Sequence, residues 1–202
     1  MYKLKTVDHI TDRLNIKGDV NLSTNAGKAL YSMASLPEVK NFIELGTQWG
    51  TSAECICRGL MESGGHLQTV EFIKERYEFA TEALKDIPVT CNWGKSFQSN
   101  GVDTHYQNHN DKSRTMSAQP ILEKLVSEIE FDAAFLDTCS ATQEREFYYL
   151  QDNTNVKYIL MHEPNIKCPN VLKTISEKWN LLEEGYDMIG VNNVLYTLYE
   201  RK

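Results

Sequence analysis

The prediction of the fold starts from one stretch, Asn41-Phe42-Ile43-Glu44-Leu45-Gly46-Thr47-Gln48-Trp49-Gly50-Thr51-Ser52. A buried strand at Lys40–Leu45 leads into two glycines, and Thr51 or Ser52 can cap the helix that follows, with Glu54 favourably placed in its first turn. Such a turn lets a ligand approach the backbone, and the N–H groups of the helix beyond it can receive an anion or a hydroxyl group. Tight packing of the strand against the helix would require the same glycines, so the turn alone is a modest signal.

Strand and helix patterns alternate along the rest of the chain, which predicts βα units in one α/β domain over residues 1–202. Further strands are expected at His66–Glu71, Val89–Trp93, Phe131–Leu136 and Tyr158–Met161, and Phe131–Leu136 has the clearest pattern of a buried strand. One helix is expected in a helical prelude over residues 1–38, from a cap at Ser23 or Thr24 through Ala34. Others are expected at Glu75–Leu84 and through Phe147 and Leu150. A further helix should start at Pro120 and have an apolar face formed by Ile121, Leu122, Leu125, Val126 and Ile129. The strands Asn180–Leu182 and Val194–Tyr199 leave no room for a crossover helix, so we expect them to be antiparallel.

A carboxylate ends the second predicted strand. Thr69-Val70-Glu71 follows the Gly64-Gly65 turn, which stops the preceding helix. An acid at this position can accept hydrogen bonds from both ribose hydroxyls of an adenosine cofactor, as it does in dinucleotide-binding folds. The plain alternative is a surface glutamate at the end of a strand.

Taken in order, these motifs resemble class I methyltransferases that use S-adenosyl-L-methionine (SAM). The resemblance covers roughly residues 42–163 and is closest to small-molecule O-methyltransferases of the macrocin, rhamnosyl and cephalosporin-methylating type. It implies a Rossmann-like doubly wound sheet, mostly parallel with an antiparallel C-terminal strand and with helices on both faces. It also implies a cofactor site formed by Glu44, Gly46, Thr47, Gly50, Ser52, Glu71, Phe72, Gly94, Lys95, Ser96 and Asp137.

Within this resemblance each motif has a part. The first motif, around Gly46, holds the methionine end of SAM, and Glu71 binds the ribose. Trp93-Gly94-Lys95-Ser96 resembles the turn that edges the adenine, and Phe131–Asp137 resembles the fourth-strand motif. Many relatives carry Gly and then His soon after the fourth-strand Asp, whereas here Thr138-Cys139-Ser140 follow, and this departure puts the reaction in doubt.

Ligands of open α/β sheets bind beyond the carboxyl ends of the strands, where Asp137, His162 and Glu163 should emerge. In one hypothesis, one of these three catalytic candidates is a general base that removes a hydroxyl proton. In the other, Asp137 and Glu163, with Asn165, bind Mg²⁺, which would lower the pKa of the acceptor hydroxyl. Each side chain also has a structural reading, as a loop residue or a satisfied core histidine.

The formal net charge of -7, with no cluster of Lys and Arg, disfavours attraction to phosphate backbones or anionic lipid. We therefore expect a small-molecule acceptor and neither nucleic acid nor membrane as a partner, and a homodimer stays open.

Five scattered cysteines without CxxC spacing indicate reduced thiols in a cytoplasmic protein. No apolar run approaches the roughly 20 residues of a membrane span.

Two other functions remain as alternatives. An NAD-dependent oxidoreductase would favour G-x-G-x-x-G, whereas this chain has Gly46 and Gly50 in a G-x-x-x-G pattern. A noncatalytic SAM-binding module with a decayed acceptor site would be consistent with the altered Thr138–Ser140 segment.

The polar segment Gln98–Ala118 exceeds ordinary loop length, which is typical of a functional lid or of disorder. Its His105 and His109 are interpreted as exposed loop histidines.

Overall fold

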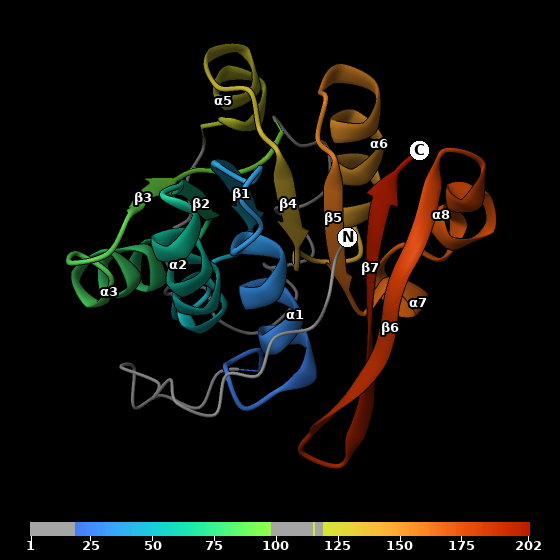
Figure 1. The fold of residues 1–202 in the computed structure, drawn as a ribbon. Helices are drawn as coiled ribbons and strands as arrows, with labels where there is room; N and C mark the ends of the chain where they lie inside the picture. The colour runs from blue at the N-terminus through green and yellow to red at the C-terminus, as the bar shows by residue number, and fades with distance from the viewer. Residues whose placement is uncertain (1–18, 98–114, 116–118) are drawn as a thin grey trace.

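The computed structural model describes residues 19–97, 115 and 119–202. In this part of the chain seven strands form one sheet in the order β3-β2-β1-β4-β5-β7-β6 (Figure 1). The strands are β1 (Asn41–Leu45), β2 (His66–Glu71), β3 (Val89–Trp93), β4 (Ala133–Leu136), β5 (Tyr158–His162), β6 (Trp179–Ile189) and β7 (Asn192–Arg201). Strands β1 to β5 are parallel, and β7 is antiparallel to both β5 and β6. The predicted fold class, a mostly parallel doubly wound sheet with an antiparallel end, is confirmed.

Helices cover both faces of the sheet (Figure 1). They are α1 (Asn25–Ala34), α2 (Thr51–Ser63), α3 (Lys74–Ala83), α5 (Leu122–Glu128), α6 (Gln143–Asn153), α7 (Pro164–Lys167) and α8 (Pro169–Thr174), followed by the short 3₁₀ helix η1 (Ile175–Glu177). Alternate residues of a buried strand point to opposite faces, so Phe42 belongs to the hydrophobic cluster under α1 and α2 while Ile43 belongs to the cluster under α5 and α6.

Two predicted helix starts shift, each for a local reason, and a third is as expected. The N-cap of α2 is Gly50, in a left-handed conformation and without a side-chain cap, because the Ser52 hydroxyl bonds to Glu44 instead. The helix expected from Pro120 begins at Leu122, since Pro120 forms an isolated bridge with Lys95. The helix at Asn25–Ala34 is capped by Thr24, as predicted.

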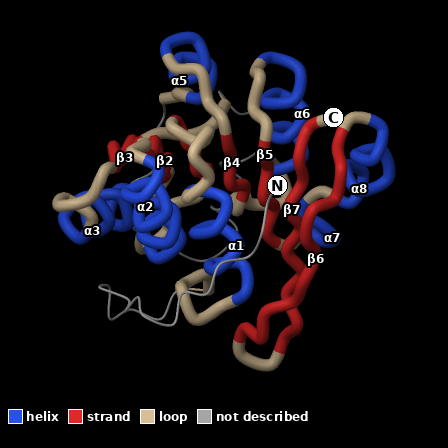
Figure 2. The backbone as a smooth tube through the Cα atoms, in the orientation of Figure 1, coloured by secondary structure: helices blue, strands red, loops and turns tan. Residues whose placement is uncertain are grey.

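The C-terminal strands form a hairpin that is longer than the sequence predicts and extends past the end of the parallel sheet (Figure 2). Its turn contains Gly190, which has a positive φ of 63°. Asp187 in β6 is buried and accepts hydrogen bonds from the backbone N–H groups of Asn25 and Ala26, at 2.6 and 2.8 Å. The hairpin is thereby tied to the first turn of α1.

All five cysteines lie among the described residues and are free thiols, as predicted. Across the described ranges, every helix is too short or too polar to cross a membrane. The segment expected as a lid or disordered loop, 98–118, lies outside the described residues apart from Thr115, and so do His105 and His109.

Candidate functional site

The candidate site is a cavity of about 260 Å³ at the carboxyl ends of the five parallel strands. Each strand contributes a lining residue at or just after its last position, namely Gly46, Glu71, Gly94, Asp137 and His162. Of the remaining predicted site residues, Phe72, Lys95, Ser96 and Glu163 also line the cavity. Parallel strands bring their carboxyl ends to one edge of the sheet, so residues distant in sequence converge here.

Gly46 allows the loop after β1 to pass against the backbone after β4. Its φ is +100°, and a Cβ atom at this position would lie 2.4 Å from the carbonyl oxygen of Asp137. The Gly46 N–H donates to the carbonyl of Val70 at 3.1 Å, which ties the same loop to β2. Only glycine fits this position without displacing backbone.

Glu71 directs a buried carboxylate into the cavity. The backbone N–H groups of Gln48 and Ile73 each donate to it at 2.8 Å. Burial raises the pKa of Glu71, although these hydrogen bonds and the charge of Arg76 act in the opposite direction. Gln48 has a positive φ of 49°, an unfavourable conformation for a non-glycine residue, and the bond to Glu71 helps to hold it.

A second buried carboxylate, Glu44, lies beneath the cavity rather than in its wall. It accepts hydrogen bonds from Ser52 at 2.6 Å and from Thr69 at 2.5 Å, and Thr69 also bonds to Thr47. Burial raises the pKa of Glu44 to about 7 despite the two hydroxyl donors. Glu44, Thr47, Gly50 and Ser52 are not among the described residues that line this cavity, and their contact with a cofactor stays a prediction. They support the loop from below.

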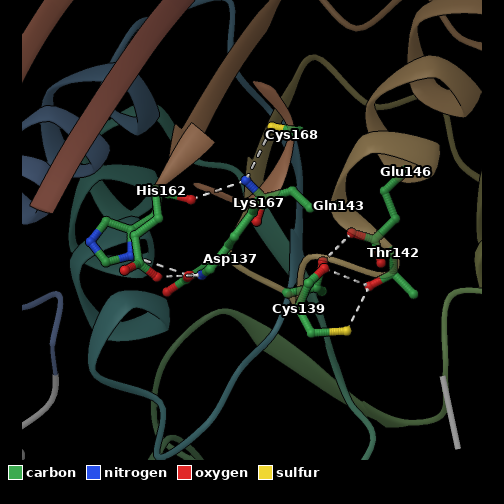
Figure 3. A network of polar contacts seen from close by, with 10 residues as sticks. Asp137, Cys139, Thr142, Gln143, Glu146, His162, Lys167 and Cys168 are labelled. Carbon is green, nitrogen blue, oxygen red and sulfur yellow. Dashed lines mark hydrogen bonds and ion pairs between the residues drawn. The ribbon is translucent and has the colours of Figure 1, made fainter. Parts of the chain in front are cut away.

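Four charged or polar side chains meet where β4 and β5 end, and Figure 3 labels three of them, Asp137, His162 and Lys167. The Nδ1 atom of His162 lies 3.1 Å from Oδ1 of Asp137. Lys167, in α7, donates from Nζ to the same Asp137 oxygen, and its Nζ lies 3.0 Å from Oε2 of Glu163. Glu163 has a positive φ of 54°, so this unfavourable backbone also borders the cavity.

The charges of this cluster reinforce one another. Burial alone would raise the pKa of the Asp137 carboxyl, but hydrogen bonds and charge from His162 and Lys167 lower it to about 2. Burial alone would lower the pKa of Lys167, but Asp137 and Glu163 raise it above its ordinary value. At neutral pH the cluster therefore contains the Lys167 ammonium group paired with the Asp137 carboxylate.

The two ring nitrogens of His162 have different surroundings. Its Nδ1 faces Asp137, and its buried Nε2 has no hydrogen-bond partner among the described residues. The side-chain amide of Gln143 donates to the backbone carbonyl of His162 at 3.0 Å and fixes the end of β5. A carboxylate on one ring nitrogen orients the imidazole and stabilises its charged form, which leaves the other nitrogen to act as a base.

The predicted magnesium ligands do not assemble as expected. Asp137, His162 and Glu163 have ligand atoms within 4.8 Å of one another, which could in principle hold an ion. Asn165, however, is exposed on α7 and does not line the cavity. Lys167 bonds to both carboxylates at the position that a cation would need. The residues present therefore do not fit Mg²⁺.

Glu146 is a site residue that the sequence interpretation missed. It is fully buried in α6, lines the cavity and accepts hydrogen bonds from the hydroxyls of Ser96 and Thr138. Burial raises its pKa to about 7, although both hydroxyl bonds oppose the shift. One signal was available: Glu146 lies four residues before Leu150, which places it on the buried face of the predicted helix.

Comparison with known proteins supports the fold at low sequence identity. Searches against protein-family models and among curated proteins found no match. An O-methyltransferase from Bacillus cereus in complex with S-adenosylhomocysteine has a TM-score of 0.62 and 16% identity, over 91% of this chain and 83% of that chain. A putative O-methyltransferase from Klebsiella pneumoniae also has a TM-score of 0.62 and 16% identity, over 93% and 83%.

A third similar structure belongs to a protein that is named for a different acceptor, RNA. A putative RNA methyltransferase from Pyrococcus horikoshii has a TM-score of 0.53 and 14% identity, over 88% of this chain and 82% of that chain. These likenesses establish the fold that the sequence predicts. The names of the three proteins include both O-methylation and RNA methylation, so the fold does not identify the acceptor.

Proposed function

We propose that this chain, which has the class I methyltransferase fold, binds SAM and transfers its methyl group to a hydroxyl of a small molecule. The observation that carries the proposal is the convergence of Gly46, Glu71 and the Asp137–His162 pair on one cavity. A loop with no side chain in the way, a buried acid and a polarised histidine are the groups that an adenosyl ligand and a proton transfer require.

The proposed cofactor position follows from the cavity wall. Glu71 accepts hydrogen bonds from the ribose hydroxyls with the carboxylate lone pairs that the N–H groups of Gln48 and Ile73 leave free. The backbone around Gly46 receives the methionine end, and Phe72, Lys95 and Ser96 border the adenine. Glu146 accepts a hydrogen bond from the Ser96 hydroxyl and holds this hydroxyl on the side of the cavity proposed for the adenine.

SAM, when bound, supplies a methyl group on a sulfonium centre to a nucleophilic oxygen and leaves as S-adenosylhomocysteine. His162 accepts at Nε2 the proton that the acceptor hydroxyl loses. Asp137 accepts the hydrogen bond from Nδ1 and stabilises the imidazolium that forms. The walls of the cavity hold the acceptor oxygen in line with the methyl group, which supplies much of the rate.

The acceptor class is proposed from charge and shape. The chain carries a formal net charge of -7, which opposes binding to a polyanion such as RNA. Ile189, Asn192 and Val194, from the C-terminal hairpin, complete the cavity wall on the side of His162. A wall with two aliphatic side chains and one amide suits a compact, partly apolar hydroxyl compound.

Titration calorimetry with SAM and with S-adenosylhomocysteine tests the proposal. We expect Glu71→Gln to weaken SAM binding by about 10- to 100-fold, because a hydrogen bond to a charged group contributes about 1.5–3 kcal/mol. Glu82→Gln, an exposed residue on the neighbouring helix α3, is the matched control and should bind as the wild type does.

The possible results separate three cases. A wild-type protein that binds neither SAM nor S-adenosylhomocysteine would overturn the proposed function. Unchanged affinity in a folded Glu71→Gln protein would remove only the ribose assignment. Binding without methyl transfer from labelled SAM to a library of hydroxyl compounds would favour a noncatalytic SAM-binding module.

A further inference from the structure

Lys167 is the one cation that bonds to both carboxylates of the described strand-end cluster. We infer that its ammonium group takes the place of a divalent metal ion between Asp137 and Glu163 and presents a hydrogen-bond donor to the acceptor oxygen. The site would then be closed to divalent cations. The role toward the acceptor rests on the proposed function, whereas the exclusion of metal does not.

The first argument is the geometry of the carboxylates. Oδ1 of Asp137 accepts from both Lys167 Nζ and His162 Nδ1, and Oε2 of Glu163 lies 3.0 Å from the same Nζ. A magnesium ion needs oxygen ligands at about 2.0–2.1 Å in octahedral geometry. The oxygens that would provide them already face an ammonium group, and a second cation at the same place would be repelled.

The second argument is that local structure fixes Lys167 in this position. Pro164 begins α7, and the N–H of Lys167 donates to the carbonyl of Glu163 at 2.8 Å, which closes one helical turn. This turn puts the two side chains at i and i+4, the spacing at which an acid and a base meet on a helix. The next residue, Cys168, is fully buried and anchors the end of the turn.

The third argument concerns the remaining hydrogen of the ammonium group. An ammonium group has three N–H donors, and Asp137 and Glu163 account for two of them among the described residues. Lys167 lines the cavity together with His162. Its third hydrogen can therefore bond to the oxygen whose proton His162 removes, and a positive donor there stabilises the developing negative charge.

Titration of the purified protein with Mn²⁺, followed by calorimetry and by the loss of the free-ion electron paramagnetic resonance signal, tests the inference. We expect no saturable binding by the wild type at about 1 mM Mn²⁺, a concentration that occupies weak carboxylate sites. Lys167→Met and Lys167→Gln remove the ammonium group and should bind Mn²⁺ at least tenfold more tightly. The double variant Lys167→Met with Asp137→Asn should lose this gained binding.

Two control variants test whether the effect requires a positive charge and whether it requires that charge at position 167. Lys167→Arg keeps a cation at the site and should exclude Mn²⁺, whereas Lys173→Met, on the surface of α8, should behave as the wild type. Circular dichroism and SAM calorimetry on each variant report whether it folds and binds the cofactor.

Two results would overturn the inference. One is Mn²⁺ binding by the wild type that Asp137→Asn abolishes. The other is a folded Lys167→Met or Lys167→Gln protein that gains no Mn²⁺ binding. Failure of SAM binding with the expected Mn²⁺ results would instead reject the proposed function and leave the exclusion of metal standing.

Discussion

The surroundings of the His162 ring support the general-base role that we propose for it. Its ring is almost fully buried, with Asp137 on Nδ1 and no described partner on Nε2. A buried polar nitrogen without a partner is costly, and such groups in native proteins often have a function. In the proposed function, the acceptor hydroxyl is the partner of this atom during turnover.

We predict that His162→Gln lowers the rate of methyl transfer by about 10²- to 10⁴-fold, the usual contribution of a general base. The affinity for SAM should change by less than about threefold, because the side chain acts on the acceptor proton. Single-turnover rates and calorimetry measure the two quantities. His66→Gln, a histidine at the opposite end of the sheet in β2, is the control. Equal losses of rate and of SAM affinity would indicate a role for His162 in binding.

At this scale the sequence predicts which strand ends carry site residues but not how the side chains pair. Asp137, His162 and Glu163 converge as expected, since the strand order determines that they must. Lys167 was missed, although its spacing of four residues from Glu163 is visible in the sequence. The bond from Lys167 back to Asp137 could not be predicted, because it depends on the angle at which α7 leaves β5.

At the scale of elements, the C-terminal hairpin and α1 depend on each other. Asp187 puts both carboxylate oxygens on the first two N–H groups of α1, while Thr24 accepts from the N–H of Gly27. A negative charge at a helix N-terminus satisfies unpaired donors and complements the helix dipole. The hairpin that lines the cavity through Ile189 is therefore held by a helix from the other end of the chain.

We predict that Asp187→Ala destabilises the protein by about 1–2 kcal/mol, the usual cost of losing a helix cap. Urea unfolding measures the loss, and faster hydrogen exchange at Asn25 and Ala26 localises it to the start of α1. Asp152→Ala, which removes an exposed aspartate, should change stability by less than about 0.5 kcal/mol. Equal stability of Asp187→Ala and wild type would mean that the hairpin is held by strand pairing alone.

The second half of β6, in the same hairpin, is the part of the sheet that the sequence pattern does not predict. Strands β1, β4 and β5 are recognised because nearly all of their residues are buried and they read as apolar runs. The second half of β6 exposes Tyr186 and Met188 to solvent and interleaves them with polar residues, so no apolar face marks it. It is a strand because β7 pairs with it as far as Ile189, and such long-range pairing is invisible in the local pattern.

At the scale of the whole molecule, the cavity joins five strand ends with the hairpin that forms one edge of the sheet. A ligand that fills it contacts segments that separate when the chain unfolds. Binding to the folded state alone raises stability in proportion to the logarithm of ligand concentration over Kd. The stability of the entire domain therefore reports on cofactor identity even while the acceptor is unknown.

We predict that S-adenosylhomocysteine at about 100 times its Kd stabilises the protein by about 2.7 kcal/mol. For a domain of this size, that corresponds to a rise in Tm of about 5–10 °C. NAD⁺ at the same concentration should leave Tm unchanged, because the G-x-x-x-G turn at Gly46 and Gly50 departs from the dinucleotide pattern. Differential scanning calorimetry measures both, and Glu71→Gln should reduce the rise. An equal rise in Tm with NAD⁺ would favour an oxidoreductase. A cavity formed by strand ends can hold any adenosine cofactor, provided that it also accommodates the part of the cofactor beyond the adenosine.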